Sequence, residues 1–219
     1  YRDDESQESL ADIPLNERYP SGPRVINVAG FDGVLPARDA AIAADLNGQA
    51  YVSPDAVMDG GFDSLHLAAY VPGANRPDRA ESLAMIRFSE DVNLTLNRSL
   101  TLDAPILNTD DATVRLNAAY VALGSTDTRF RLDGSAPLDG GGTVQADPSG
   151  GNGRLRIEAE LIDLVGDAAT QGFGTVANQP AVDLISHGDI RLRGTRIKGE
   201  TEWQGSLRTG RDLRLQGQQ

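Results

Sequence analysis

A short phrase of alternating apolar and polar residues recurs along the chain. Between residues 99 and 125 it occurs as SLTLDA and TVRLNA, and a further alternation, YVALG, follows directly. Two apolar side chains two residues apart lie on one face of a β-strand, and the polar side chain between them lies on the other. The Ala or Gly that closes the phrase suits a sharp corner of the backbone. The pattern therefore predicts short strands that bury one face.

The same phrase accounts for much of the chain after Gly61. Its copies are SLHLAA from Ser64, MIRFSE from Met85, SLTLDA from Ser99, TVRLNA from Thr113, RFRLDG from Arg129, RLRIEA from Arg154, DIRLRG from Asp189 and DLRLQG from Asp212. Weaker alternations, VNLTL, YVALG, ELIDLVG and AVDLIS, lie between them. Several spacings between copies cluster near 21 to 23 residues, about what one coil of three strands takes.

Strands of this length and spacing fit either a β-sandwich or a parallel β-helix. Dipeptides typical of hairpins, such as Asn-Gly and Asp-Gly, are present but seldom lie between two clear strands. The phrase keeps the same polarity and the same closing corner in its copies, as parallel stacking of like on like requires. We therefore predict an all-β protein with a parallel β-helix and irregular loops, most obviously in the Gly-rich stretch from Gly140. The sandwich is the alternative.

The first 52 residues lack the phrase and form a less regular N-terminal flank. Residues 1–20 are polar and acidic, without a clear period. The flank is predicted to hold strands at 24–29 and 49–52, and a short helix or an Ala-rich loop at 39–46. Directly after it, Ser53 at an N-cap position and Pro54 at the first helical position predict one helical turn that ends by Gly60 or Gly61. The chain thus divides into a flank, 1–52, and a β-helix segment, 53–219.

Composition narrows the classes of function. A formal net charge of −12 argues against binding to nucleic acid or to an acidic membrane surface. There are no cysteines, which excludes disulfides and thiolate chemistry. No apolar run is long enough to span a bilayer. The chain opens with Tyr1 and without a signal peptide, so we expect it to be an internal piece of a longer protein.

Together the phrases resemble the filamentous haemagglutinin family, the large exoproteins of two-partner secretion in Gram-negative bacteria. The matching stretches are GGFDSLHL from Gly60, DVNLTLNRSLTLDAP from Asp91, VRLNAAYVALGS from Val114, ELIDLVGDAATQGFGTV from Glu160, GDIRLRG from Gly188 and GRDLRLQ from Gly210. The resemblance implies a right-handed parallel β-helix, secretion to the cell surface through an outer-membrane transporter partner, and roles in adhesion, biofilm or contact-dependent interaction. The family's secretion domain and a toxin domain are not recognisable, so the segment resembles an internal shaft.

Arginine often occupies the outward position in the middle of the phrase. The arginines concerned are Arg87, Arg115, Arg131, Arg156, Arg191 and Arg214, and His66 takes an equivalent place. On one sheet they would form a basic ladder that binds sulfated glycans, acidic polysaccharide or lipopolysaccharide through charge-assisted hydrogen bonds. The alternative is that they cover a solvated sheet and pair with Asp or Glu on adjacent coils.

Catalytic and metal-binding patterns are scarce. His66 and His187 neighbour no nucleophile motif and are interpreted as surface residues. A polysaccharide-acting β-helix enzyme would need paired carboxylates, and its candidates are Asp110 with Asp111 or Asp139 with Asp147. Paired Asp in a turn is more often a turn former. Neither calcium pattern, the β-roll nonapeptide or the EF-hand, is present. We therefore predict a protein that is not an enzyme and has no cofactor or metal. Trp203 is either a core plug or a surface contact.

Overall fold

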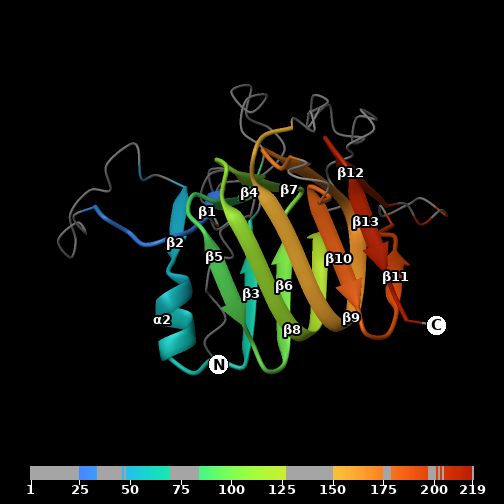
Figure 1. Ribbon diagram of the computed structural model, residues 1–219, viewed down its shortest axis with the longest axis horizontal. Helices are drawn as coiled ribbons and strands as arrows, with labels where there is room; N and C mark the ends of the chain where they lie inside the picture. Colours follow the sequence, from blue (N-terminus) through green and yellow to red (C-terminus); the bar gives the residue numbers. More distant parts are fainter. Residues whose placement is uncertain are drawn as a thin grey trace, which may run out of the picture.

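In the residues that the computed structural model describes, the protein consists of β-strands and one short α-helix. These residues are 25–33, 46, 48–69, 84–126, 150–174, 179–196, 201, 203 and 205–218. The elements are β1 (Val25–Val28), β2 (Gln49–Val52), α2 (Pro54–Asp59), β3 (Ser64–Ala68), β4 (Met85–Phe88), β5 (Val92–Thr95), β6 (Ser99–Asp103), β7 (Ile106–Thr109), β8 (Thr113–Ser125), β9 (Arg154–Gln171), β10 (Val182–Ser186), β11 (Ile190–Arg193), β12 (Ser206–Thr209) and β13 (Leu213–Gln216) (Figure 1).

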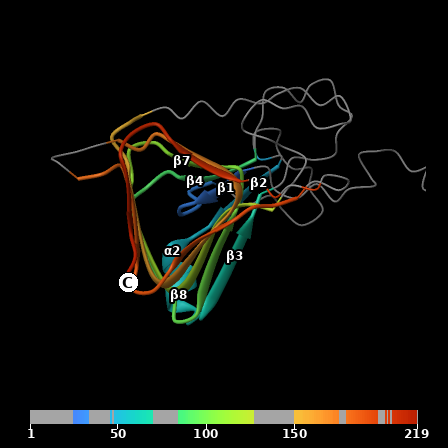
Figure 2. The same ribbon diagram turned by 90° about the vertical axis from the view of Figure 1, so that its right-hand side faces the viewer.

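All the strand pairings within this part of the chain are parallel, and the strands form one 13-stranded sheet. The sheet curls around its own core, with β1, β4 and β7 on one side (Figure 2). We call this the first side, and it contains β2, β1, β4, β7, the end of β9 and β12. The second side contains β5, the first halves of β8 and β9, β10 and β13. The third contains β3, β6, the later parts of β8 and β9, and β11.

The chain visits the sides in a fixed order. It runs from β4 on the first side to β5 on the second and β6 on the third, and then returns to the first side with β7. Hydrogen bonds between successive passes here join residues 21, 22 and 23 positions apart. This repeat is the one that the phrase spacing predicts, and it puts chemically similar residues on top of one another.

Between β8 and β9, the described strands depart from this order. From the end of β8 on the third side, the chain reaches the start of β9 on the second side without adding a described strand to the first. On the first side β7 therefore pairs directly with the end of β9, Ile106 with Ala169. The Gly-rich stretch predicted as an outward loop lies in this interval, and residues 140–149 of it fall outside the described part of the chain.

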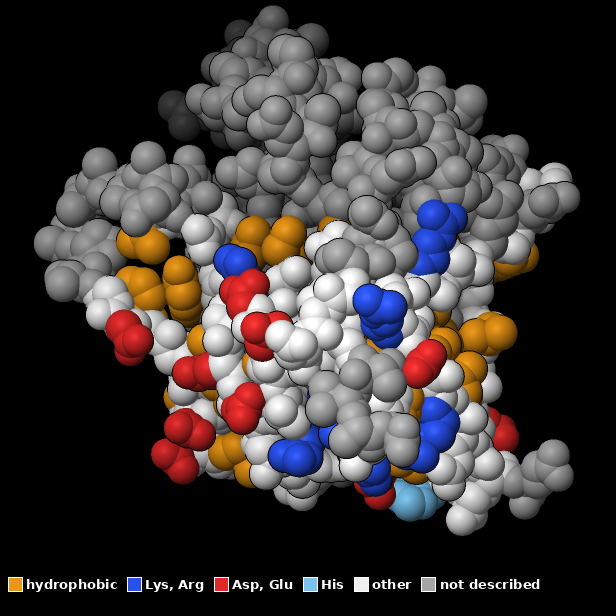
Figure 3. All heavy atoms as spheres, turned by 45° about the horizontal axis from the view of Figure 1, so that its top comes forward, with side chains coloured by type: hydrophobic (Ala, Val, Ile, Leu, Met, Phe, Trp, Pro, Cys, Tyr) orange, Lys and Arg blue, Asp and Glu red, His pale blue; other side chains and the backbone are white. Residues whose placement is uncertain are grey.

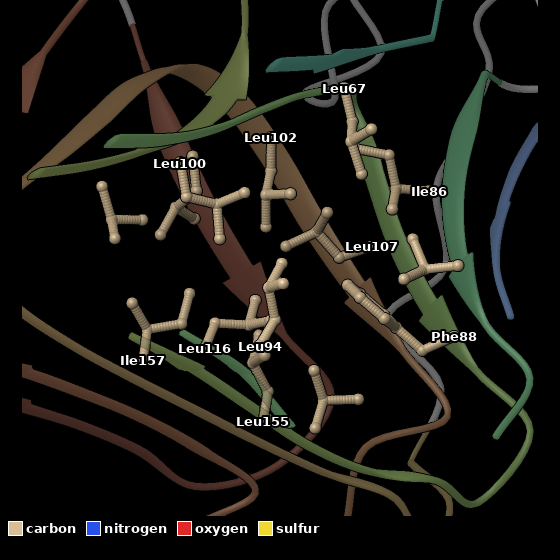
Figure 4. Close-up of a cluster of buried hydrophobic side chains, with 14 of the residues drawn as sticks. Leu67, Ile86, Phe88, Leu94, Leu100, Leu102, Leu107, Leu116, Leu155 and Ile157 are labelled. Carbon is tan, nitrogen blue, oxygen red and sulfur yellow. The ribbon is translucent and has the colours of Figure 1, made fainter. Parts of the chain in front are cut away.

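The inward-facing apolar side chains of the strands fill the interior of the curled sheet. The core side chains include Leu67, Ile86, Phe88, Leu94, Leu100, Leu102, Leu107, Leu116, Leu155 and Ile157 (Figure 4). Burying one such side chain contributes about 1.5–3 kcal/mol. Since one pass of the chain buries only a few of them, it cannot offset its own ordering entropy, and stability depends on the neighbouring layers.

The prediction of an all-β protein with parallel strands is confirmed. The described copies of the phrase are all strands, as is each weaker alternation, whereas the copy from Arg129 lies outside the described residues. Ser53 caps α2 by accepting a hydrogen bond from the Ala56 amide at 3.2 Å, as predicted. The helix or loop predicted at 39–46 lies, apart from its last residue, outside the described residues. The two strands of the flank are confirmed, and β1 pairs with β4, so the flank contributes to the main sheet. The division at residue 52 stays a prediction.

Candidate polyanion-binding groove

The second side carries a row of outward arginines. In β8 and β9 the inward residues Val114 and Leu155 are buried, and the alternation of the strand turns the next residue outward. Strand register then aligns one outward residue from each layer. The row runs Asn93, Arg115, Arg156, Asp183 and Arg214. Arg115 and Arg156, which are 41 residues apart in the sequence, are direct cross-strand neighbours.

The other predicted arginines lie elsewhere. Arg87 is on the first side and pairs with Asp110, Nη2 to Oδ2 at 2.9 Å. Arg191 is on the third side and pairs with Asp163, Nε to Oδ1 at 2.6 Å. Arg131 lies outside the described residues. The predicted residues therefore do not form a single ladder, because successive copies of the phrase fall on different sides as the chain turns.

Around the row lies a groove of about 350 Å³. Arg115, Arg154, Arg156 and Arg214 line it, together with Gln179, Pro180 and Asp183. Arg154 is not among the arginines predicted for the ladder. The strand alternation could have identified it, because Arg154 and Arg156 both flank the buried Leu155 and therefore lie on the same outward face.

Positive charge in the groove is only partly neutralised. The buried Asp183 carboxylate accepts a hydrogen bond from Arg214 Nε at 2.7 Å and lies 3.5 Å from Arg156 Nη1. The hydrogen bond and the charge of Asp183 raise the pKa of Arg214, which keeps it charged. In the described part of the chain, Arg115 and Arg154 have neither a hydrogen bond nor an ion pair through their side chains. Arg115 lies directly opposite Arg156 across β8 and β9. Like charges in such a pair are destabilising, so an anion bound between them would be stabilising.

A second carboxylate, that of Glu158, binds side chains next to the groove. Glu158 accepts a hydrogen bond from Arg156 at 2.9 Å and lies 3.0 Å from His187 Nε2. The hydrogen bonds with Arg156 and His187 lower the pKa of Glu158. His187 thus has a surface ion-pair environment, and His66 is exposed on β3, which fits the prediction for both.

Charge is also distributed unevenly over the molecule. In the face shown in Figure 3, acidic side chains gather at the end where α2 lies, and most Lys and Arg side chains lie in the centre and toward the other end. The acidic net charge of the whole chain therefore coexists with a locally basic surface. This arrangement permits an anionic ligand to approach one part of the stack.

The carboxylate pairs proposed for an enzyme do not form a site where the structure describes them. Asp110 pairs with Arg87, and Asp111 has a positive φ of 87° and accepts a hydrogen bond from the Asn152 amide at 3.1 Å. Both belong to a turn, in agreement with their interpretation as turn formers. Asp139 and Asp147 lie outside the described residues. Within the described residues, no group of three or more His, Cys, Asp or Glu side chains could hold a metal ion.

No family model matches the chain, no curated protein matches it, and no solved structure matches its fold. Among the described residues, no helix has the length and apolar character needed to cross a bilayer. The family resemblance, the surface location and the absence of enzymatic activity therefore stay predictions.

Proposed function

We propose that this protein is a right-handed parallel β-helical shaft segment of a secreted bacterial surface exoprotein, with a role in adhesion, biofilm or contact-dependent interaction. The observation that carries the proposal is the open end of the stack. Leu192, Leu213 and Leu215, in β11 and β13, are 79%, 37% and 49% exposed. Their partners one layer below, Leu164, Val182 and Leu184, are buried in the core.

The exposed leucines occupy core positions, and no described strand forms a layer above them. At the other end of the stack, α2 lies over β5, with Val57 buried in the core and the Thr95 amide 3.4 Å from the Met58 sulfur. The two ends thus differ among the described residues, since one carries a covering helix and the other presents exposed apolar side chains and strand edges that pair with no described strand. Exposed strand edges are normally covered or blocked in native proteins, and a further layer of strands would cover this one.

The order of the strands supports the β-helix. Parallel strands joined by a crossover connection are right-handed in nearly all known cases, which is the basis for the right-handed form. From β4 to β8 the chain visits the first, second and third sides in turn with 21 to 23 residues per pass, and this order supports a three-sided coil. A stack of this kind extends by about 4.8 Å per layer and holds whatever lies at its far end at a distance from the cell.

Resemblance to the filamentous haemagglutinin family supports the remaining parts of the proposal. It is the basis for secretion through an outer-membrane transporter partner and for a location at the surface of a Gram-negative bacterium. Host or bacterial surface glycans and receptors are the partners that this function implies.

The test is the coding sequence that follows position 219 in the parent gene, together with the shape of the secreted product. We expect further copies of the phrase, and an elongated rod by electron microscopy. Hydrogen exchange should show protected β13 amides in the intact protein and rapid exchange in the 219-residue chain. A globular product with equally fast exchange at β13 in both chains would overturn the proposal.

A second candidate function is binding of a polyanion such as a sulfated glycan, and it is favoured by Arg115 and Arg154, whose side chains pair with no described residue. We expect retention on heparin resin at low salt, and loss of retention when both arginines are changed to Ser. Arg87→Ser removes the same charge from the first side and serves as the control. Failure of the parent to bind, or an equal loss with the control, would contradict this function.

A further inference from the structure

The third side has a hollow that the predicted functions do not use. Two outward rows run side by side across it. One contains Thr101, Ala122 and Asp163, and the other contains Asp103, Gly124 and Val165. Ala122 and Gly124 have almost no side chain, so the surface between their larger neighbours is lowered. The resulting hollow has a volume of about 380 Å³, within the usual range for small-ligand sites.

Hydrogen bonds fix the polar groups around this hollow. Asp163 is fully buried and accepts hydrogen bonds from Tyr120 Oη at 2.8 Å and Arg193 Nη1 at 2.9 Å. Asp103 accepts hydrogen bonds from the Thr126 amide at 2.9 Å and its hydroxyl at 2.6 Å. Tyr120, Arg193 and Asp103 all line the hollow. Because their positions are set before any ligand arrives, binding would cost little ordering entropy.

Trp203 forms the rim of the hollow and is 70% exposed. Of the two alternatives that the sequence left open for Trp203, the structure shows the surface residue and not the core residue. The guanidinium carbon of Arg196 lies 5.9 Å from the ring centroid, which holds the indole by a cation–π contact. A large aromatic side chain left in water and fixed beside a hollow is a typical contact surface for a ligand.

The charges around the hollow indicate the class of ligand. Arg193 is paired with Asp163, Nη1 to Oδ2 at 2.9 Å, and Asp103 lines the hollow together with Arg193. The hollow therefore lacks the surplus of arginine that marks the groove on the second side. Its floor is apolar, its rim is a flat indole, and its walls offer a carboxylate and hydroxyl groups. A pyranose ring has the matching form, with an apolar C–H face and hydroxyl groups at its edge.

We propose that this hollow binds a neutral hexopyranose unit of a polysaccharide, with the sugar face on Trp203 and its hydroxyls toward Asp103 and Arg193. The site differs from the arginine groove in position, charge and ligand class. It also stands independently of the shaft function, since it depends on the third side alone.

Trp203 is the only tryptophan, so the intrinsic fluorescence of the chain reports on this site directly. The experiment titrates the protein with cellohexaose, maltohexaose, mannohexaose and chitohexaose at up to millimolar concentration. We expect at least one of them to shift the emission to shorter wavelength and to saturate. Calorimetry with that sugar should show about a tenfold loss of affinity for Trp203→Ala.

Two further variants locate the site. Thr101→Tyr places a bulky side chain in the hollow, leaves Trp203 in place and should abolish the fluorescence shift. Arg115→Ser alters only the second side and should leave the shift unchanged. Absence of a shift with every sugar would overturn the proposal, as would a shift that survives Thr101→Tyr in a variant with an unchanged circular dichroism spectrum. A parent protein that shows the fluorescence shift but does not bind heparin would count against the groove and leave this site standing.

Discussion

Replacing Asp163 by Asn tests the electrostatics of the third side. The carboxylate is fully buried, with Arg191 Nε at 2.6 Å, Arg193 Nη1 at 2.9 Å and Tyr120 Oη at 2.8 Å. Burial raises the pKa of Asp163, and the hydrogen bonds from Arg191, Arg193 and Tyr120 outweigh this effect and lower it from 3.8 to about 2. The charged form is therefore favoured in the folded protein, despite its removal from water.

That difference in pKa corresponds to about 2 kcal/mol of stability at neutral pH. Because the folded pKa lies below the unfolded one, this contribution is present above the unfolded value of 3.8 and is lost as the pH falls through about 2. Roughly 1 kcal/mol of it should remain near pH 3. Asp163→Asn lacks the charge at every pH, so its deficit should shrink over the same interval.

Urea unfolding followed by circular dichroism, at pH 7 and in steps from pH 5 to pH 2, measures both effects. The control is Asp110→Asn, which removes a carboxylate from an exposed ion pair with Arg87 and should cost less than about 1 kcal/mol. The account of Asp163 would be refuted if its variant lost no more stability than the control. A deficit that stayed constant down to pH 2 would refute it equally.

Three further predictions concern the stack itself. Leu102→Asn places an amide in the core and should lower the free energy of unfolding by about 3 kcal/mol or more. Thr101→Asn, on the outward face of β6, should change it by less than about 0.5 kcal/mol. Equal losses of the two variants in urea unfolding would contradict the assignment of inward and outward residues in β6. Gly124 has a φ of +133°, and an added Cβ would meet the Val165 carbonyl oxygen at 1.9 Å. Gly124→Ala should therefore lower the melting temperature by several degrees. An unchanged melting temperature would argue against this backbone conformation at Gly124. Ser53→Ala removes the cap of α2 and should cost about 1 kcal/mol in urea unfolding, while Ser53→Asp should cost almost nothing; equal losses would speak against the cap.

The sequence predicts the strands better than their positions in the sheet. Alternation locates β6 and β8 because each has two apolar residues that fill the core and a polar one between them. It does not find β7 or β12, and in β7 the adjacent residues Ile106 and Leu107 are both buried, so the expected alternation is absent. Burial on both faces of a strand removes the signal on which the prediction depends.

The candidate groove depends on which strands stack, and this is a long-range property. Arg115 and Arg156 share a row because β8 and β9 both begin on the second side and pair in register, although the two residues are 41 positions apart in the sequence. Nothing local in either phrase specifies that pairing. In the same way, the small side chains of Ala122 and Gly124 form a hollow only when β6 and β9 flank them. The sequence indicates which residues face outward, but it does not indicate which strands lie next to one another in the sheet.

The central claim is that the chain stacks in register, with parallel strands on top of one another. Disulfide formation between introduced cysteines tests it most directly, because the natural chain contains no cysteine. Thr95 and Asn117 are register partners on β5 and β8. Parallel neighbours lie about 4.8 Å apart, within the Cα separation of about 4.4–6.8 Å that a disulfide requires.

Mass spectrometry after mild oxidation of Thr95→Cys/Asn117→Cys should therefore detect a linked pair of peptides. The matched control, Thr95→Cys/Thr101→Cys, joins residues close in sequence but on different sides of the stack, and should stay reduced under the same conditions. A bond in the first variant alone is the predicted result. A bond in the control alone, or no bond in either, would contradict the stacked parallel fold.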